Sequence, residues 1–240
     1  MTQRKFSVEP LYVQVRNLLA QRIADGVWPP GGMLPNEIEL ARELGVSSGT
    51  VRKALDTLES ERLVVRRQGR GTSVVDQASG EVAARFSNIR DRSGARIISE
   101  AELIEQTAAT ANEVERQRLD LKADDPIVRT VRLRRYKGRP FMHEASVLAV
   151  GRFREMGEDE PGNYRISALA QRHGIHLGRA VEHVTVASPE AGIAKLLGVT
   201  PSTWLLKLDR IVHTSGDGPV EWRVGLCALD ENVVYLAEMT

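Results

Sequence analysis

Apolar residues recur at steps of three and four positions in three segments near the beginning of the chain. These segments are residues 11–25, 36–44 and 49–61, and the spacing predicts three helices that each bury one face. Gly45 ends the second segment, and Ser47 or Ser48 is suited to cap the third. Because only a short turn with a glycine separates the last two helices, we predict a helix-turn-helix.

Two short apolar runs follow the third helix. Residues 63–65 and 72–75 predict strands, and the turn between them, 66–71, contains three arginines and two glycines. Such a tip is unsuited to a core, but it suits contact with phosphates or a narrow minor groove of DNA. Helix, loop, helix, turn, helix and hairpin is the order of a winged helix-turn-helix, which binds double-stranded DNA with the N-terminal end of its last helix.

Beyond residue 95 the pattern changes to strands mixed with short helices. The strands are predicted at 127–136, 141–150, 181–187 and 204–213, with a further strand from Pro219, and the helices at 101–105, 113–118, 166–174 and 189–197. Residues 137–140 form the turn of a hairpin. We therefore predict a second domain of the α+β class.

Charge also divides the chain of 240 residues, whose net charge is +1. Residues 1–75 carry 11 Lys and Arg against 8 Asp and Glu, whereas the remainder carries 22 against 24. This asymmetry indicates two functions in one chain. We predict a DNA-binding domain at 1–77, a linker rich in Gly, Ser and charge at 78–95, and a second domain at 96–240.

Cysteine content and hydropathy indicate where the protein works. Cys227 is the single cysteine, so no intramolecular disulfide framework or cysteine-based zinc site is expected, and a buried position suits it. The first residues lack the apolar core of a signal peptide, and no segment has the apolar length of a membrane span. We expect a cytoplasmic protein that does not enter a membrane.

Three segments of the first domain, PLYVQV, LPNEIELARELGVSSGTVRKAL and RRQGRGT, resemble the N-terminal domain of the GntR family of bacterial transcription regulators. The resemblance covers nearly all of residues 9–75. It implies a homodimer whose third helices enter successive major grooves of an inverted-repeat operator, with the hairpin tips near the minor groove. Ile38 and the pair Ser48-Gly49 differ from the commoner family pattern, which has long or polar side chains there.

Nine residues are the expected DNA contacts. Arg52 and Tyr12 are expected to bind the DNA backbone, and Ser48, Thr50 and Arg70 to contribute sequence discrimination. The full set is Tyr12, Ser47, Ser48, Thr50, Arg52, Lys53, Gln68, Gly69 and Arg70.

Two arginines of the second domain lie on one face of a predicted strand. Arg132 and Arg134 are two positions apart, and residues at this spacing share a face of a strand. Glu144 lies on the returning strand. One interpretation is a cross-strand ion pair on a solvated face, which contributes little to stability. The other is a ligand site, in which arginines bind a carboxylate or phosphate.

The second domain resembles the UTRA effector-binding domain of the HutC subfamily of GntR regulators, which has a chorismate-lyase-like α+β fold with an antiparallel sheet. The segments that carry the resemblance are PEAGIAKLLGV, LLKLDR and DGPVEWR. It implies that a small anionic or polar metabolite binds between the sheet and the helices. The residues that match the family's effector site are Arg132, Arg134, Glu144, Ser167 and Glu221.

Three functions remain to be compared for the second domain. A lyase-like or hydrolytic enzyme would consume its ligand, a sensor would bind it unchanged, and a domain that only dimerises would bind none. His173 and His176 are the only loosely paired histidines, so no metal or other cofactor is expected. No nucleophile, Walker or dinucleotide motif occurs. We favour a sensor that controls a DNA-binding repressor rather than an enzyme.

Overall fold

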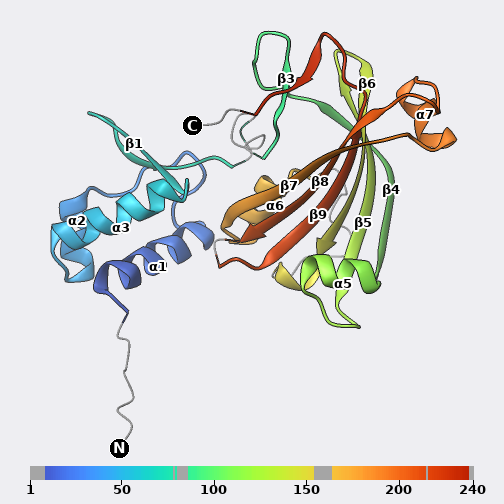
Figure 1. Cartoon of the computed structure of the whole chain (residues 1–240). Helices are drawn as coiled ribbons and strands as arrows, with labels where there is room; N and C mark the ends of the chain where they lie inside the picture. Colours follow the sequence, from blue (N-terminus) through green and yellow to red (C-terminus); the bar gives the residue numbers. More distant parts are fainter. Residues whose placement is uncertain (1–8, 78, 80–85, 154–163, 215, 238–240) are drawn as a thin grey trace, which may run out of the picture. The chain divides into compact units, whose positions relative to one another are not determined.

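The computed structural model describes residues 9–77, 79, 86–153, 164–214 and 216–237. It divides the chain into two compact units, Met1–Gln77 and Ala78–Thr240 (Figure 1). Among the described residues, no helix is both long and apolar enough to cross a membrane.

The first unit is a winged helix-turn-helix, as predicted. Its elements are α1 (Leu11–Ala24), α2 (Glu37–Leu44), α3 (Ser48–Ser60), β1 (Val64–Arg67) and β2 (Gly71–Val74). Strands β1 and β2 pair antiparallel, with Arg67 opposite Gly71 at the tip of the hairpin.

Local hydrogen bonds fix the ends of the helix-turn-helix. The side chain of Asn36 accepts hydrogen bonds from the amides of Ile38 and Glu39, and the Glu39 carboxylate accepts one from the Asn36 amide. This capping box satisfies amides that have no partner within the helix. Gly45 ends α2 with a φ of 66°, a conformation that disfavours residues with a Cβ.

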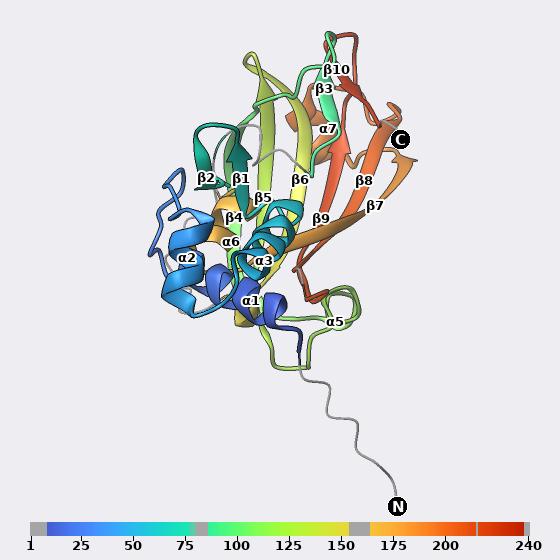
Figure 2. The same cartoon turned by 90° about the vertical axis from the view of Figure 1, so that its left-hand side faces the viewer.

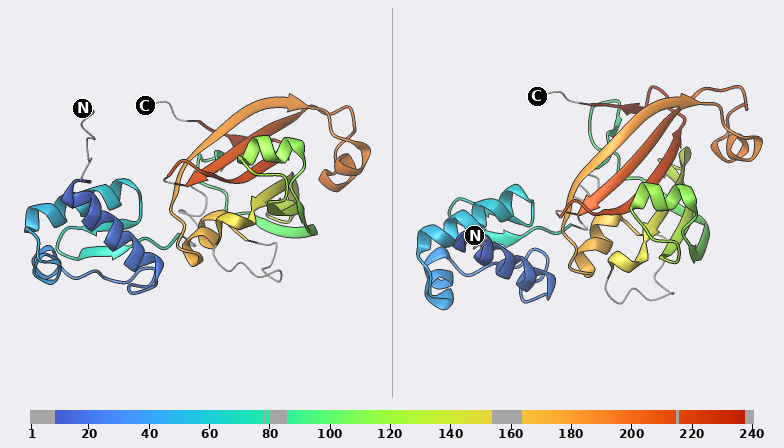
Figure 3. Two further views of the ribbon diagram at one scale, coloured as in Figure 1. Left: turned by 90° about the horizontal axis from the view of Figure 1, so that it is seen from below. Right: turned by 60° about the horizontal axis from the view of Figure 1, so that its bottom comes forward.

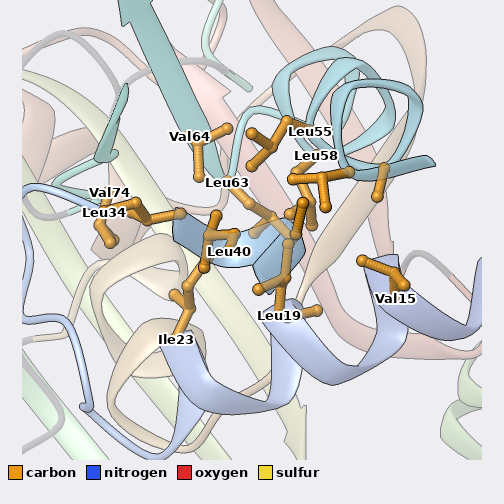
Figure 4. Close-up of a cluster of buried hydrophobic side chains, with 14 residues drawn as sticks. Val15, Leu19, Ile23, Leu34, Leu40, Leu55, Leu58, Leu63, Val64 and Val74 are labelled. Carbon is orange, nitrogen blue, oxygen red and sulfur yellow. The ribbon is translucent and has the colours of Figure 1, made fainter. Parts of the chain in front are cut away.

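The three helices and the hairpin enclose one core, which Figure 4 shows. Residues from each element are almost fully buried, because one apolar face of every helix points to the same centre. The labelled members are Val15, Leu19, Ile23, Leu34, Leu40, Leu55, Leu58, Leu63, Val64 and Val74.

The second unit is built on one antiparallel sheet of six strands. The strands are β4 (Glu100–Thr110), β5 (Pro126–Tyr136), β6 (Arg139–Ala149), β7 (Leu177–Ala187), β8 (Leu205–Thr214) and β9 (Pro219–Cys227). Their order is β4-β5-β6-β9-β8-β7, and Figure 2 shows them side by side in this order. The predicted α+β fold with an antiparallel sheet is confirmed.

Short helices cover the two faces of this sheet. They are α5 (Glu113–Leu119), the 3-10 turn η1 (Val150–Arg152), α6 (Ile166–Arg172) and α7 (Ala191–Leu197). Val147 packs in the cluster of α5, and its neighbour Leu148 packs in that of α6. Adjacent residues of a strand point to opposite faces, so α5 and α6 lie on opposite faces. Figures 1 and 3 show α5 and α7 at opposite ends of the strands.

Two parts of the second unit differ from the sequence prediction. The predicted helix at 101–105 was wrong, because these residues belong to strand β4, which pairs with β5 along almost its whole length. Within the predicted linker, residues 89–91 form β3 (Ile89–Asp91), which pairs with β10 (Val233–Tyr235). Residues 78 and 80–85 of that linker lie outside the described residues.

Candidate DNA-binding surface and effector cavity

The nine expected DNA contacts are all at least partly exposed in the first unit. Ser48, Thr50, Arg52 and Lys53 lie in the first half of α3, and Gln68, Gly69 and Arg70 form the turn between β1 and β2. The structure therefore leaves the N-terminal end of α3 and the hairpin tip accessible to a partner.

Two candidate cations are held by neighbours in the same unit. The Arg52 guanidinium donates a hydrogen bond of 2.9 Å to Glu37 of α2, and the Lys53 ammonium lies 3.9 Å from the centre of the Tyr12 ring. Both side chains are exposed, so such contacts add little stability. They do reduce the number of orientations that Arg52 and Lys53 sample before DNA arrives.

Ser47 has a structural function in addition to its predicted contact. Its hydroxyl accepts a hydrogen bond of 3.1 Å from the Thr50 amide and lies 2.8 Å from the Thr50 hydroxyl. This N-cap begins α3 and places the Thr50 side chain at the exposed end of the helix.

Arg66 fixes the hairpin to α3, a function that the sequence did not reveal. Its guanidinium donates to the Asp56 carboxylate at 2.6 Å and to the Arg52 carbonyl at 3.0 Å, and its amide donates to Glu59 at 3.0 Å. Because these hydrogen bonds join Arg66, the third residue of β1, to α3, they hold the hairpin against that helix. Arg70, in contrast, forms no hydrogen bond or ion pair through its side chain in the described part of the chain, and it is exposed.

The second unit brings Arg132 and Arg134 together around Glu144, as the period of two predicts. Arg132 lies directly opposite Glu144 on the neighbouring strand, and its guanidinium is 3.2 Å from the carboxylate. Arg134 donates two hydrogen bonds to the same carboxylate, at 2.9 and 3.1 Å. Arg132 and Glu144 are 0% and 2% exposed, so their ion pair is buried. The interpretation of a cross-strand pair on a solvated face was therefore wrong.

A third arginine, missed by sequence reasoning, completes this cluster. Arg223 of β9 donates to Glu144 at 3.1 Å and to Glu221 at 2.8 Å. Arg223 is two positions beyond Glu221 in the same strand, so the two side chains lie on the same face of the sheet, by the argument used for Arg132 and Arg134.

The arginines determine the ionisation of Glu144. Burial on its own would raise the pKa of this carboxyl group, but Arg134, Arg223 and Arg132 outweigh burial and hold the pKa well below its usual value. Burial likewise opposes the charge of Arg223, yet Glu144 and Glu221 raise its pKa. Glu144 therefore stays ionised at neutral pH, where three arginines surround its carboxylate.

A cavity of about 90 Å³ opens beside this cluster, large enough for several water molecules or part of a small ligand. Its charged lining consists of four arginines and two glutamates, so it carries an excess of positive charge. These residues are Arg134, Arg165, Arg210, Arg223, Glu144 and Glu182. Apolar walls come from residues such as Phe86, Ile97, Phe141 and Leu208.

The five expected effector residues occupy different places relative to this cavity. Arg134 and Glu144 line it, whereas Arg132 and Glu221 are buried within the cluster. Ser167 is buried in the first turn of α6, next to the lining residue Ile166. In the described ranges, no three His, Cys, Asp or Glu side chains are grouped to hold a metal ion.

The two units match two families of known proteins. Residues 11–74 match the family described as bacterial regulatory proteins, gntR family, and residues 96–231 match the UTRA domain. The chain belongs to the GntR family and carries a UTRA domain. It is therefore a transcription regulator with an effector-binding domain and not an enzyme.

Individual relatives are repressors. A histidine utilization repressor from Pseudomonas putida is 40% identical over 87 residues, which is 36% of this chain but only 35% of that protein. An HTH-type transcriptional repressor from Salmonella typhimurium is 28% identical over 221 residues, 91% of this chain and 92% of that protein. These similarities support a GntR repressor of the HutC subfamily.

Solved structures share the fold. PhnF from Mycobacterium smegmatis has a TM-score of 0.55 and 26% identity, and the match covers 94% of this chain and 99% of that one. The ligand-binding domain of a GntR-family regulator from Bordetella bronchiseptica has a TM-score of 0.57 and 25% identity, with 65% of this chain and 98% of that chain covered.

Proposed function

We propose that this repressor binds an inverted-repeat operator as a homodimer in the cytoplasm. The α3 helices of the two subunits enter successive major grooves, and the hairpin tips approach the minor groove. Support comes from the exposed first half of α3 and from the exposed Arg70 at the tip of a hairpin that Arg66 ties to α3.

We further propose that a small anionic or polar metabolite in the cavity of the second unit controls this binding. The observation that carries the proposal is the charged lining, in which four arginines exceed two glutamates beside apolar walls. Guanidinium groups bind carboxylates and phosphates with two parallel hydrogen bonds, and the glutamates suit hydroxyl or amine groups. A second unit that served dimerisation alone would need no charged cavity.

Control requires a difference in affinity between two states of the protein. A metabolite shifts the protein toward the state that it binds better, and the segment 78–95 would transmit the change to the DNA-binding units. A coupling free energy of about 1 to 3 kcal/mol changes the affinity for DNA by roughly 5- to 150-fold.

Fluorescence anisotropy with labelled DNA from the region upstream of its own gene tests the operator proposal. We expect binding that is selective over scrambled DNA at two salt concentrations, with two chains per duplex. Native mass spectrometry should give twice the chain mass of 26.6 kDa for the free protein. Equal affinity for both DNAs, or one chain per duplex, would contradict the proposal.

A further inference from the structure

A row of five polar residues crosses the face of the sheet that carries the cavity. Each residue lies directly opposite the next on the neighbouring strand, from β5 through β6, β9 and β8 to β7. In order they are Thr130, Ser146, Arg223, Arg210 and Glu182. The row connects the cluster around Glu144 with the edge strand β7, and none of its five members belongs to the effector site expected from the sequence.

Arg210 and Glu182 form a nearly buried ion pair at the cavity wall. Two nitrogens of Arg210 donate to one carboxylate oxygen, Oε1 of Glu182, at 2.7 Å from Nε and 2.5 Å from Nη2. The side chains are 9% and 11% exposed, and both line the cavity. In the described part of the chain, these are the only hydrogen bonds from the Arg210 side chain, so its other N–H groups remain for a ligand.

Arg210 also lies directly opposite Arg223, and like charges in this position repel. Arg223 is neutralised by Glu144 and Glu221, whereas Arg210 has Glu182 alone. An anion in the cavity beside Arg210 would therefore relieve repulsion and compete with Glu182 for the same guanidinium.

The second carboxylate oxygen of Glu182 connects the cavity to the strands β3 and β10. The Tyr235 hydroxyl donates a hydrogen bond of 3.0 Å to Oε2 of Glu182, and it accepts one of 3.0 Å from the Asn88 side chain. The Asn88 carbonyl in turn accepts a hydrogen bond of 2.8 Å from the Leu236 amide. Asn88 directly precedes β3, the first described strand after the boundary between the two units.

We propose that an anionic effector displaces Glu182 from Arg210, and that this loss releases Tyr235 and loosens the pairing of β3 with β10. The inference rests on the proposed function, since it requires an anion in the cavity. Glu182 holds both partners with one carboxylate, Arg210 on Oε1 and Tyr235 on Oε2, so it cannot reorient toward solvent or another group and keep both. Binding of an anion in the cavity thereby changes the pairing of strand β3.

Two substitutions test the contacts of Glu182 with Arg210 and with Tyr235 separately. Glu182→Gln removes the charge that pairs with Arg210, and Tyr235→Phe removes the hydroxyl but leaves the ion pair. In each variant, without ligand or DNA, we expect hydrogen exchange at the amides of β3, β10 and Leu236 to rise about tenfold, the scale of one hydrogen bond to a charged group. Exchange in the core of β6 should stay unchanged, which shows that the unit remains folded.

A matched control is available on the same sheet. Glu102→Gln breaks an exposed ion pair between Glu102 and Arg135 on strands β4 and β5. It should not change exchange in β3 and β10. Unchanged exchange in Glu182→Gln and Tyr235→Phe, or an equal rise in Glu102→Gln, would overturn the proposal.

Inorganic phosphate, at constant ionic strength maintained with chloride, serves as the anion. We expect phosphate to raise exchange in β3 and β10 of the wild-type protein but not of Tyr235→Phe, and to bind Glu182→Gln severalfold more tightly than wild type. Phosphate that binds all three proteins equally, with no change in exchange, would overturn the inference and leave an anion-binding cavity in place. If none of the three proteins binds phosphate, the proposal of an anionic effector is contradicted, and this inference fails with it.

Discussion

At the scale of single residues, Arg70 is a cation available to DNA. It is exposed at the hairpin tip and is not engaged by any side chain in the described ranges. Arg70→Ala should weaken operator binding and reduce the slope of log affinity against log salt by about one unit, because one phosphate contact releases about one counterion. Titrations at several salt concentrations measure this slope.

Arg116→Ala is the matched control for Arg70→Ala. This arginine lies on α5 of the second unit, where it pairs with Glu113. Its removal should leave both affinity and slope unchanged. A slope that is the same in Arg70→Ala and wild type would exclude Arg70 from the interface.

Glu144 is the residue on which the buried cluster depends. Glu144→Gln leaves three arginines without their shared carboxylate, and breaking a buried pair in this way costs about 3 to 5 kcal/mol at neutral pH. Urea unfolding followed by tryptophan fluorescence would measure the loss. Glu102→Gln, at an exposed ion pair, should change the free energy of unfolding by less than about 1 kcal/mol.

The lowered pKa of Glu144 predicts how this stabilisation depends on pH. Because the folded state lowers this pKa, the contribution is complete above the unfolded value, about 4.3, and decreases as pH falls below it. The difference in free energy of unfolding between wild type and Glu144→Gln should therefore shrink from pH 6 toward pH 3. A constant difference over this range would show that the charge of Glu144 is not what stabilises the cluster.

The sequence predicted the neighbours within one strand better than those across strands. Arg132 and Arg134 share a face because their spacing is two, and the structure confirms it. The pairing of Arg210 with Glu182, or of Arg223 with Glu144, depends on the order and register of β6, β9, β8 and β7. Residue types and spacing do not encode that register.

At the scale of elements, the capping box at the start of α2 gives a simple test of the helix-turn-helix. Asn36→Ala removes the acceptor for two amides and should lower the free energy of unfolding of the first unit by about 1 kcal/mol. Asn36→Asp retains an acceptor and should preserve stability. Urea unfolding followed by the helical circular dichroism signal distinguishes them, and equal stability of Asn36→Ala and wild type would contradict the assigned cap.

Strand β4 shows where local pattern fails. The alanines, glutamates and leucine in its sequence favour a helix, yet β4 pairs with β5 at ten positions. Most of its side chains are exposed, so no strict alternation of apolar and polar residues marks it as a strand. Pairing with a neighbouring strand overrides such a weak preference.

At the scale of the whole molecule, the sequence predicts two units, because the charge balance differs between residues 1–75 and the remainder and the hydrophobic pattern changes beyond residue 95. The segment predicted as a linker, 78–95, contains a strand that the sequence analysis did not predict. Residues 89–91 pair with 233–235, which are about 140 positions away, and local composition carries no sign of so distant a partner. This pairing makes the segment part of the second unit.

The central claim is that a ligand in the cavity of the second unit changes the affinity of the first unit for DNA. The most direct measurement is an anisotropy titration of the wild-type protein on its operator, with and without each member of a panel of anionic metabolites. We expect one compound to change the dissociation constant for DNA by about fivefold or more, without being consumed, and to lose that effect in Glu144→Gln. A compound that binds the cavity while the dissociation constant for DNA stays the same would contradict the account.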